Sequence, residues 1–202
     1  KGRVTLQGAR TGITAGAVPD GGHVLNLSRM NQIVGLRRDE ASGSFRVTVQ
    51  PGVLLADLRK YLREEVETRF RETGRAYFFP SDPTEASASI GGMVACNASG
   101  ARSLFYGPTR NYVERLRVVL ADGSTVDLRR GRDRAAGRAF TLTTDAGRKI
   151  QGRVPSYIMP RVKNAAGYFA DDNMDLVDLL IGAEGTLGIV TEIELKLIPM
   201  PN

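Results

Sequence analysis

The sequence predicts an α+β fold in which a mixed or antiparallel sheet is flanked by helices. Several short segments alternate apolar with polar residues, as half-buried strands do, and others repeat their apolar residues at helical spacing. Strand-like and helix-like segments do not alternate regularly, which argues against a doubly wound α/β sheet. The 202 residues suffice for one large domain, or two small ones, with a hydrophobic core.

The first predicted strands enclose a run of small residues. Residues 4–7 predict a short strand, and residues 8–17, rich in Gly, Ala and Thr, follow it directly. Such a run is typical of a loop whose backbone approaches another group closely. A turn at residues 19–22 leads into the next predicted strand, residues 23–27.

A third strand and a helix come next. Residues 45–49 alternate between apolar and polar side chains, which predicts a half-buried strand that stops at Pro51 and Gly52. Helical spacing then predicts an amphipathic helix that ends by Gly74. Its apolar face consists of Leu55, Leu58, Tyr61 or Leu62, and Val66.

The second half of the chain contains a predicted hairpin, a helix and a final strand. Asp122-Gly123 separates two strand-like runs, and this dipeptide is a strong signal for a two-stranded hairpin. Asp172 or Asn173 is suited to cap a helix that Gly182 ends. Residues 189–197 alternate strictly and predict a long, edge-like strand.

The net charge of +6 comes from a concentration of basic residues within 129–153. These are Arg129, Arg130, Arg132, Arg134, Arg138, Arg148, Lys149 and Arg153. We interpret them as a solvated surface insertion, since charge runs usually lie in solvent. The alternative is a basic anion- or nucleic-acid-binding module, for which interleaved aromatic residues are expected; only Phe140 is near.

The sequence gives no indication of a disulfide, a metal site or a membrane-spanning helix. Cys96 is the one cysteine, so no internal disulfide forms, and we expect a buried, inert thiol. His23 has no neighbouring ligand cluster, and no metal site is predicted. The longest uncharged stretch, residues 86–101, is shorter than the about 20 residues that a membrane-spanning helix requires. We therefore expect a cytoplasmic protein without a membrane span.

Three segments rich in glycine and small residues are candidates for phosphate binding: 8–17, 89–100 and 182–188. Unhindered backbone N–H groups in such loops bind phosphate oxygens. None has the Gly-Lys-Ser/Thr of a P-loop or the glycine pattern of a Rossmann turn. Any phosphate is therefore bound by an architecture other than a P-loop or a Rossmann turn. Each segment, taken singly, is also compatible with a plain chain turn.

Seven motifs in order cover most of the chain. They lie at residues 7–19, 26–31, 49–53, 79–83, 89–100 (as 89–92 and 97–100, with 106–107 after them), 163–168 and 182–190. Together they resemble the FAD-linked oxidases and dehydrogenases of the vanillyl-alcohol-oxidase superfamily, whose FAD-binding domain is called PCMH-type. The resemblance is greatest to the branch of the glycolate oxidase subunit and D-lactate dehydrogenase.

The resemblance implies that residues 1–202 form the FAD-binding domain of an enzyme that oxidises a 2-hydroxy acid such as glycolate or D-lactate. Hydride would pass to flavin N5, and the catalytic residues would lie on a following cap domain. We expect a segment of a longer protein, inactive alone, that lacks the domain's first strand–helix–strand. Expected partners are a small-molecule substrate and an electron-transfer partner, but no nucleic acid. A flavin-free scaffold is a further alternative.

The resemblance also implies which residues contact FAD. They are Gly8, Ala9, Arg10, Thr11, Gly12, Ile13, Thr14, Gly16, Ala17, Pro80, Ser89, Gly91, Gly92, Asn97, Ser99, Gly100, Tyr106, Glu184, Gly188 and Ile189. Ala9 and Arg10 stand where the family usually has glycine, and Arg10 either pairs with a phosphate or points to solvent. Because residues 8–17 contain no His, Tyr or Cys, we expect the flavin to be held non-covalently.

Overall fold

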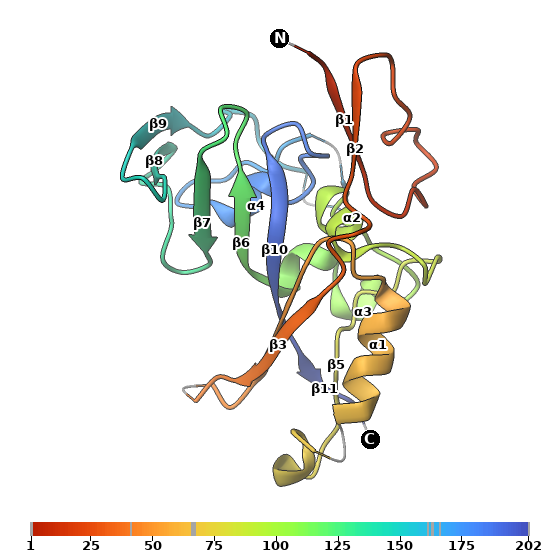
Figure 1. The fold of residues 1–202 in the computed structure, drawn as a ribbon. Coiled ribbons are helices and arrows are strands. Elements are labelled where there is room, and N and C mark those ends of the chain that lie inside the picture. Colours follow the sequence, from red (N-terminus) through yellow and green to blue (C-terminus); the bar gives the residue numbers. More distant parts are fainter. Residues whose placement is uncertain are drawn as a thin grey trace.

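The computed structural model describes residues 2–40, 42–65, 68–160, 162, 164–165 and 167–201. Val66 of the predicted helix and Lys163 and Ala166 of the sixth motif lie outside the described residues. Figure 1 shows a central antiparallel sheet, with helices on one side and a separate strand pair, β1 and β2, at one end. The predicted α+β class is confirmed.

Five strands form the main sheet. They are β3 (Ile33–Arg38), β4 (Phe45–Val49), β10 (Ile189–Lys196), β6 (Val113–Val119) and β7 (Thr125–Arg129), in that spatial order. Every neighbouring pair is antiparallel. The predicted hairpin at Asp122-Gly123 joins β6 to β7, with Gly123 in the left-handed conformation at φ 83°.

The strand predicted as an edge is in fact the centre of the sheet, and that prediction is wrong. Ile193 of β10 lies opposite Val49 of β4 on one side and Leu116 of β6 on the other. The charged residues that alternate with its apolar ones suggested an exposed edge. Glu194, however, is only 3% exposed and is paired with both Arg37 and Arg129, which neutralise its charge.

Three smaller strand pairs complete the β-structure. Both strands predicted around the small-residue run are present, and β1 (Val4–Gln7) pairs in parallel with β2 (His23–Asn26). The antiparallel pairs are β5 (Tyr77–Phe78) with β11 (Ile198–Pro199), and β8 (Ala139–Thr143) with β9 (Lys149–Arg153). The sheet content is therefore mixed, as predicted.

The helices are short apart from α1 (Leu55–Glu64). Its predicted apolar face is confirmed, since Leu55, Leu58 and Leu62 are buried. A 3-10 turn, η2 (Arg71–Thr73), follows it and ends at Gly74, whose φ is 63°. The other helices are α2 (Ile90–Ala95), α3 (Ser103–Tyr106), η3 (Thr109–Tyr112) and α4 (Val177–Leu180).

The helix predicted after residue 172 is reduced to the single turn α4, and its predicted cap is wrong. Asn173 adopts the left-handed conformation, with φ 57°, and its side-chain oxygen accepts a hydrogen bond from the amide of Gly137. The local sequence competes with helix formation here because an Asn side chain readily satisfies a nearby backbone group. Among the described residues, no helix is long and apolar enough to cross a membrane.

The arginine-rich stretch is not a loose surface insertion throughout, contrary to our interpretation. Arg129 pairs with the buried Glu194, and Arg130 pairs with Asp178, whose side chain is 9% exposed. Part of the stretch forms β8 and β9. The tertiary fold places these arginines beside carboxylates that are distant in sequence.

Candidate functional site

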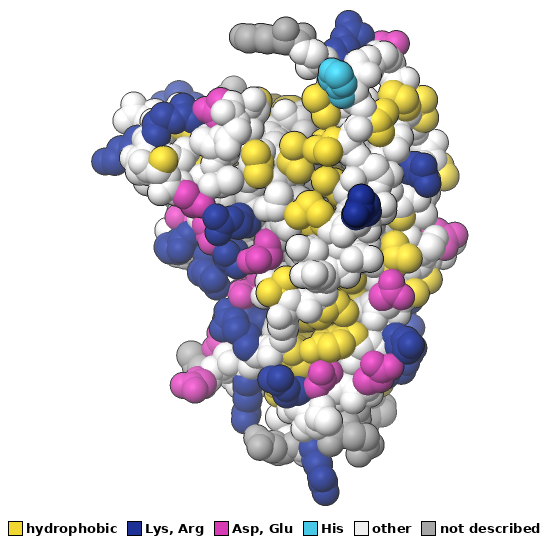
Figure 2. Space-filling view, in the orientation of Figure 1, with side chains coloured by type: hydrophobic (Ala, Val, Ile, Leu, Met, Phe, Trp, Pro, Cys, Tyr) yellow, Lys and Arg dark blue, Asp and Glu magenta, His cyan; other side chains and the backbone are white. Residues whose placement is uncertain are grey.

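A cleft of about 430 Å³ lies where three segments meet. Residues 6–17 form one wall, residues 83–99 a second, and residues 180–190 a third. Figure 2 shows mostly apolar and uncharged side chains on the surface between β1–β2 and the main sheet, whereas charged side chains gather elsewhere on this face. The three glycine-rich segments that the sequence analysis singled out thus come together in space.

The loop between β1 and β2 presents unpaired backbone donors to the cleft. Within the described part of the chain, no N–H group of residues 11–14, 16 or 17 donates a hydrogen bond to another protein group. A Cβ added at Gly12 would meet no atom within 4 Å, and one at Gly16 only Glu184 Oε2, at 3.5 Å. Amides without a protein partner, in a loop that lines a cleft, are suited to bind a phosphate-bearing ligand.

Ser89 holds this loop against the second wall. Its Oγ accepts a hydrogen bond from the amide of Ala9 at 3.3 Å. The same Oγ accepts one from the amide of Gly92 at 3.3 Å and so caps the first turn of α2. Ser89 is 3% exposed, so the loop is tied to α2 by a buried oxygen.

Most of the residues predicted from the family resemblance line the cleft. These are Gly8, Arg10, Thr11, Gly12, Ile13, Thr14, Gly16, Ala17, Ser89, Gly91, Gly92, Ser99, Glu184 and Gly188. The agreement shows that the motifs mark one continuous surface. It does not make every glycine a cofactor contact.

Gly91 packs closely on Pro51 in the second wall of the cleft. A Cβ there would lie 2.5 Å from Pro51 Cβ and 2.8 Å from the Pro51 carbonyl oxygen, which accepts a hydrogen bond from the Gly91 amide. At Gly92 a Cβ would meet only Ser89 Oγ, at 3.0 Å. The two neighbouring glycines therefore have different roles: Gly91 lets α2 approach Pro51, and Gly92 leaves the cleft open.

Six of the predicted residues do not line the cleft. The Ala9 amide donates a hydrogen bond to Ser89 Oγ, and Pro80 is buried. Gly100 packs tightly on the backbone of Asp82. Tyr106 packs edge-to-face on Phe78, and Ile189 pairs with Val119 in the main sheet. The sixth, Asn97, lines a different pocket.

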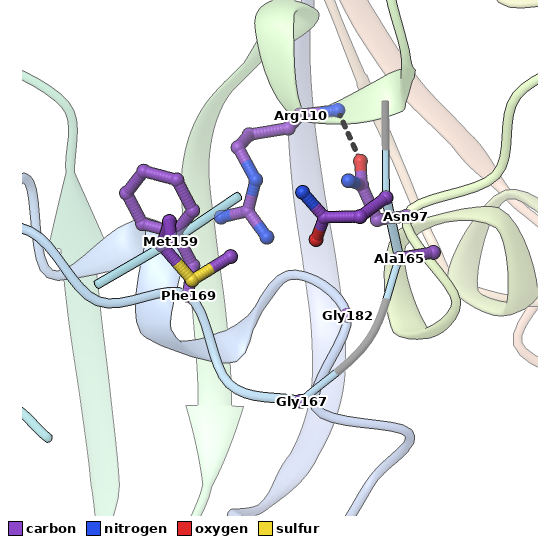
Figure 3. Close-up of a pocket in the computed structure, with 8 residues that line it drawn as sticks. Asn97, Arg110, Met159, Ala165, Gly167, Phe169 and Gly182 are labelled. Carbon is purple, nitrogen blue, oxygen red and sulfur yellow. Dashed lines mark hydrogen bonds between the residues drawn. The ribbon is translucent and has the colours of Figure 1, made fainter. Parts of the chain in front are cut away.

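Asn97 lines a second, smaller pocket of about 70 Å³ (Figure 3). Its side-chain oxygen accepts a hydrogen bond from the Arg110 amide, and the Arg110 guanidinium lies 4.4 Å from the centroid of the Phe169 ring. Arg110 also donates to Asp178. Burial lowers the pKa of Arg110, and the charge of Asp178 opposes that shift. This network anchors the segment that begins the third wall.

Several apolar lining residues were missed by the sequence analysis. Pro51, Met93 and Leu187 line the cleft beside the predicted loops. Met93 lies one helical turn after Ser89 or Ile90 in α2, and Leu187 lies inside the last glycine motif. Both residues therefore lie within segments that the sequence analysis singled out, residues 89–100 and 182–188. Pro51 follows the end of β4 and lies in the third motif, residues 49–53, which was not assigned to the ligand.

Cys96 differs from our expectation of a buried thiol, because it is exposed and lines the cleft. Neighbouring protein atoms and the negative charge of Glu184 raise the pKa of the Cys96 thiol. His23 is also exposed. Within the described ranges, no group of three or more His, Cys, Asp or Glu side chains is placed to hold a metal ion.

A mixed α+β domain in which a loop with unpartnered amides lines a largely apolar cleft is suited to bind a phosphate-bearing cofactor. The family model described as FAD binding domain matches residues 1–129. This chain belongs to the FAD-binding domain family, and its cofactor is FAD. The family resemblance seen in the sequence is thereby confirmed.

The chain is similar to enzymes that are about three times as long. It is 37% identical over 200 residues to D-lactate dehydrogenase of Anaerostipes hadrus, and 34% identical over 201 residues to glycolate oxidase subunit GlcD of Bacillus subtilis (strain 168). Both alignments cover 98% of this chain and 32% of the relative. The chain thus spans about a third of the length of these curated relatives.

The fold is also similar to that of a solved structure of alkyldihydroxyacetonephosphate synthase. The TM-score is 0.64 at 20% sequence identity, and the match covers 98% of this chain and 30% of that chain. At this identity the likeness concerns the fold alone. The match extends beyond residue 129, to almost the whole of this chain.

The described residues fit FAD. The free amides of residues 11–14 suit the diphosphate, which is an array of hydrogen-bond acceptors. Met93, Leu187 and Val190 provide an apolar surface of the kind that a flat, aromatic ring system requires. The cleft therefore offers polar donors for one part of the cofactor and an apolar wall for another.

Proposed function

We propose that this chain is the FAD-binding domain of a flavin-dependent dehydrogenase or oxidase that acts on a 2-hydroxy acid. The observation that carries the proposal is the cleft, in which a loop with free amides faces an apolar wall. Bound FAD supplies the hydride-accepting chemistry, and the protein supplies binding and orientation. The names of two relatives contain D-lactate and glycolate, and both compounds are 2-hydroxy acids.

In this proposal the chain's own residues hold and position the cofactor. The amides of residues 11–14 and 16–17 bind the diphosphate, and Ser89 keeps that loop at a set distance from α2. Apolar side chains such as Met93 and Leu187 exclude water from part of the cleft. None of the described residues is assigned as catalytic.

We propose further that a second domain of the longer protein binds the substrate and carries the base that removes the hydroxyl proton. The relatives' greater length supports this division of labour. An electron acceptor would then reoxidise the flavin. Arg129–Arg153 does not favour the rival role in polyanion binding, because six of its arginines are paired with carboxylates of this chain: Arg129, Arg130, Arg132, Arg134, Arg138 and Arg148.

We also propose that FAD is held non-covalently, since the loop of residues 8–17 contains no side chain known to form a flavin linkage. Because Cys96 lines the cleft, the test has to exclude its thiol as a site of covalent flavin attachment. Acid precipitation of the full-length protein should release all flavin to the supernatant. Flavin that stays with the precipitate of the wild type and not with that of Cys96→Ser would contradict the proposal.

Anaerobic titration of the purified full-length protein tests the function. We expect a flavin absorbance band near 450 nm that D-lactate or glycolate bleaches, whereas a matched carboxylic acid without the 2-hydroxyl group leaves it unchanged. Bound flavin that no 2-hydroxy acid reduces would overturn the substrate class. Folded protein that binds no FAD would overturn the whole proposal.

A further inference from the structure

The cofactor loop contains two residues whose backbone conformation favours glycine. Arg10 has φ 61° and Ala15 has φ 62°. A side chain in this left-handed region costs free energy relative to glycine, because Cβ approaches the following carbonyl oxygen. Such a strained position in a binding loop is a reason to look for a function of its side chain.

The Arg10 side chain lines the cleft and carries a positive charge. Among the described residues that line the cleft, it is the one that carries a positive charge, whereas Glu85 and Glu184 carry negative charges. Arg10 is exposed, and its guanidinium has no carboxylate within ion-pair distance in the described part of the chain. By contrast, Arg3, at the start of the same strand pair, is paired with Asp20 at 3.1 Å.

We propose that the Arg10 side chain pairs with the diphosphate of FAD and supplements the backbone amides of the same loop. This rests on the proposed function. The diphosphate is a dianion in a cleft whose other formal charges are the carboxylates of Glu85 and Glu184, so a cation at the loop offsets their repulsion. The ligand contact compensates the strain that Arg10 imposes on the loop.

The competing explanation is that Arg10 points to solvent and the strain is merely tolerated. The two explanations differ in what a glycine at position 10 would do. A tolerated arginine predicts that Arg10→Gly relieves strain and binds FAD at least as tightly. A diphosphate contact predicts that the same variant binds FAD more weakly, because the lost charge outweighs the relieved strain.

The test is equilibrium titration of the full-length apoprotein with FAD, followed by flavin fluorescence at several salt concentrations. We expect Arg10→Gln to weaken FAD binding by about 10-fold or more, which is typical for the loss of one charge-assisted hydrogen bond. Arg10→Gly should also bind more weakly than wild type, and Arg10→Lys should retain part of the affinity. The affinity of Arg10→Gln should depend less on salt.

Two matched control variants separate the effect of lost charge on FAD affinity from the effect of relieved backbone strain. Arg29→Gln removes an exposed arginine that does not line the cleft, and Ala15→Gly relieves the second left-handed residue without a change of charge. Neither should weaken FAD binding. Titration with ADP, which shares the diphosphate, should reproduce the loss in Arg10→Gln, and unchanged melting temperatures should show that the variants fold.

The outcomes distinguish the two proposals. If folded wild-type protein binds no FAD, the proposed function fails. If wild type binds FAD and Arg10→Gln binds it with the same affinity and salt dependence, the role of Arg10 is overturned and the proposed function stands. Tighter binding by Arg10→Gly than by wild type would overturn the role of Arg10 as well.

Discussion

Ala9 and Ser89 are 80 residues apart in sequence and are joined by a hydrogen bond, in which the Ala9 amide donates to Ser89 Oγ at 3.3 Å. The same oxygen caps α2 through the Gly92 amide. One buried hydroxyl therefore sets the position of the cofactor loop relative to the helix on the opposite side of the cleft. The two hydrogen bonds of Ser89 therefore couple the stability of α2 to the position of the cofactor loop.

Ser89→Ala should lower both stability and FAD affinity. Loss of the helix cap costs about 1 kcal/mol of unfolding free energy, and the Ala9 amide loses its partner. Urea unfolding and FAD titration of the full-length protein measure the two effects. Ser87→Ala is the matched control, because Ser87 is exposed and bonds only to Glu85 nearby. Equal effects of both substitutions would contradict the role of Ser89.

The adjacent glycines of α2 should respond differently to a valine. Gly91→Val should cost about 1–3 kcal/mol of stability, as overpacking does, because Cβ would collide with Pro51. Gly92→Val should cost less stability and abolish flavin retention, because its branches would project past Ser89 into the cleft. Thermal melts and the flavin content of purified variants check this. The reverse pattern would show that we have assigned the two roles wrongly.

The Cys96 thiol should react slowly at neutral pH. Its pKa is raised by the surrounding protein atoms and by Glu184, so the reactive thiolate forms only above the usual range for cysteine. The rate of iodoacetamide labelling should therefore rise at higher pH than for a free cysteine. Glu184→Gln should shift that rise part of the way back, and bound FAD should protect the thiol. Fast labelling at pH 7, unaffected by FAD, would contradict this account.

Asp178→Asn should destabilise the third wall of the cleft. Asp178 is the carboxylate that Arg110 and Arg130 share, and its loss leaves two partly buried cations without that partner. Removal of one member of a buried charge cluster costs about 3 kcal/mol. Urea unfolding measures the loss. Arg132→Ala, which breaks an exposed pair with Asp133, should change stability by less than about 1 kcal/mol and leave flavin content unchanged.

Local patterns predicted most individual elements. The helix at Leu55–Glu64, the hairpin at Asp122-Gly123 and the strand at Ile189–Lys196 all follow from periodicity and turn chemistry. The position of that last strand did not follow. The charged residues that alternate along it suggested an edge, but Glu194 is buried, and its arginine partners come from β3 and β7, which are distant in sequence.

The candidate site was predicted as a set of motifs and not as a geometry. The cofactor loop and Ser89 follow from the family resemblance, but the packing of Gly91 on Pro51 depends on how α2 meets the end of β4. The exposure of Cys96 likewise depends on tertiary structure, because residues 89–100 were predicted as a binding segment without any indication of which side chains face the cleft. Long-range contacts decide which motif residues face the ligand.

A crystal structure of the full-length protein with FAD tests the central claim most directly. We predict that diphosphate oxygens lie within about 3.2 Å of the backbone nitrogens of residues 11–14, between the β1–β2 loop and α2. The flavin or adenine should then contact the apolar wall around Met93 and Leu187. FAD bound elsewhere, for example beside the arginines of residues 129–153 with this cleft free of ligand, would contradict the account.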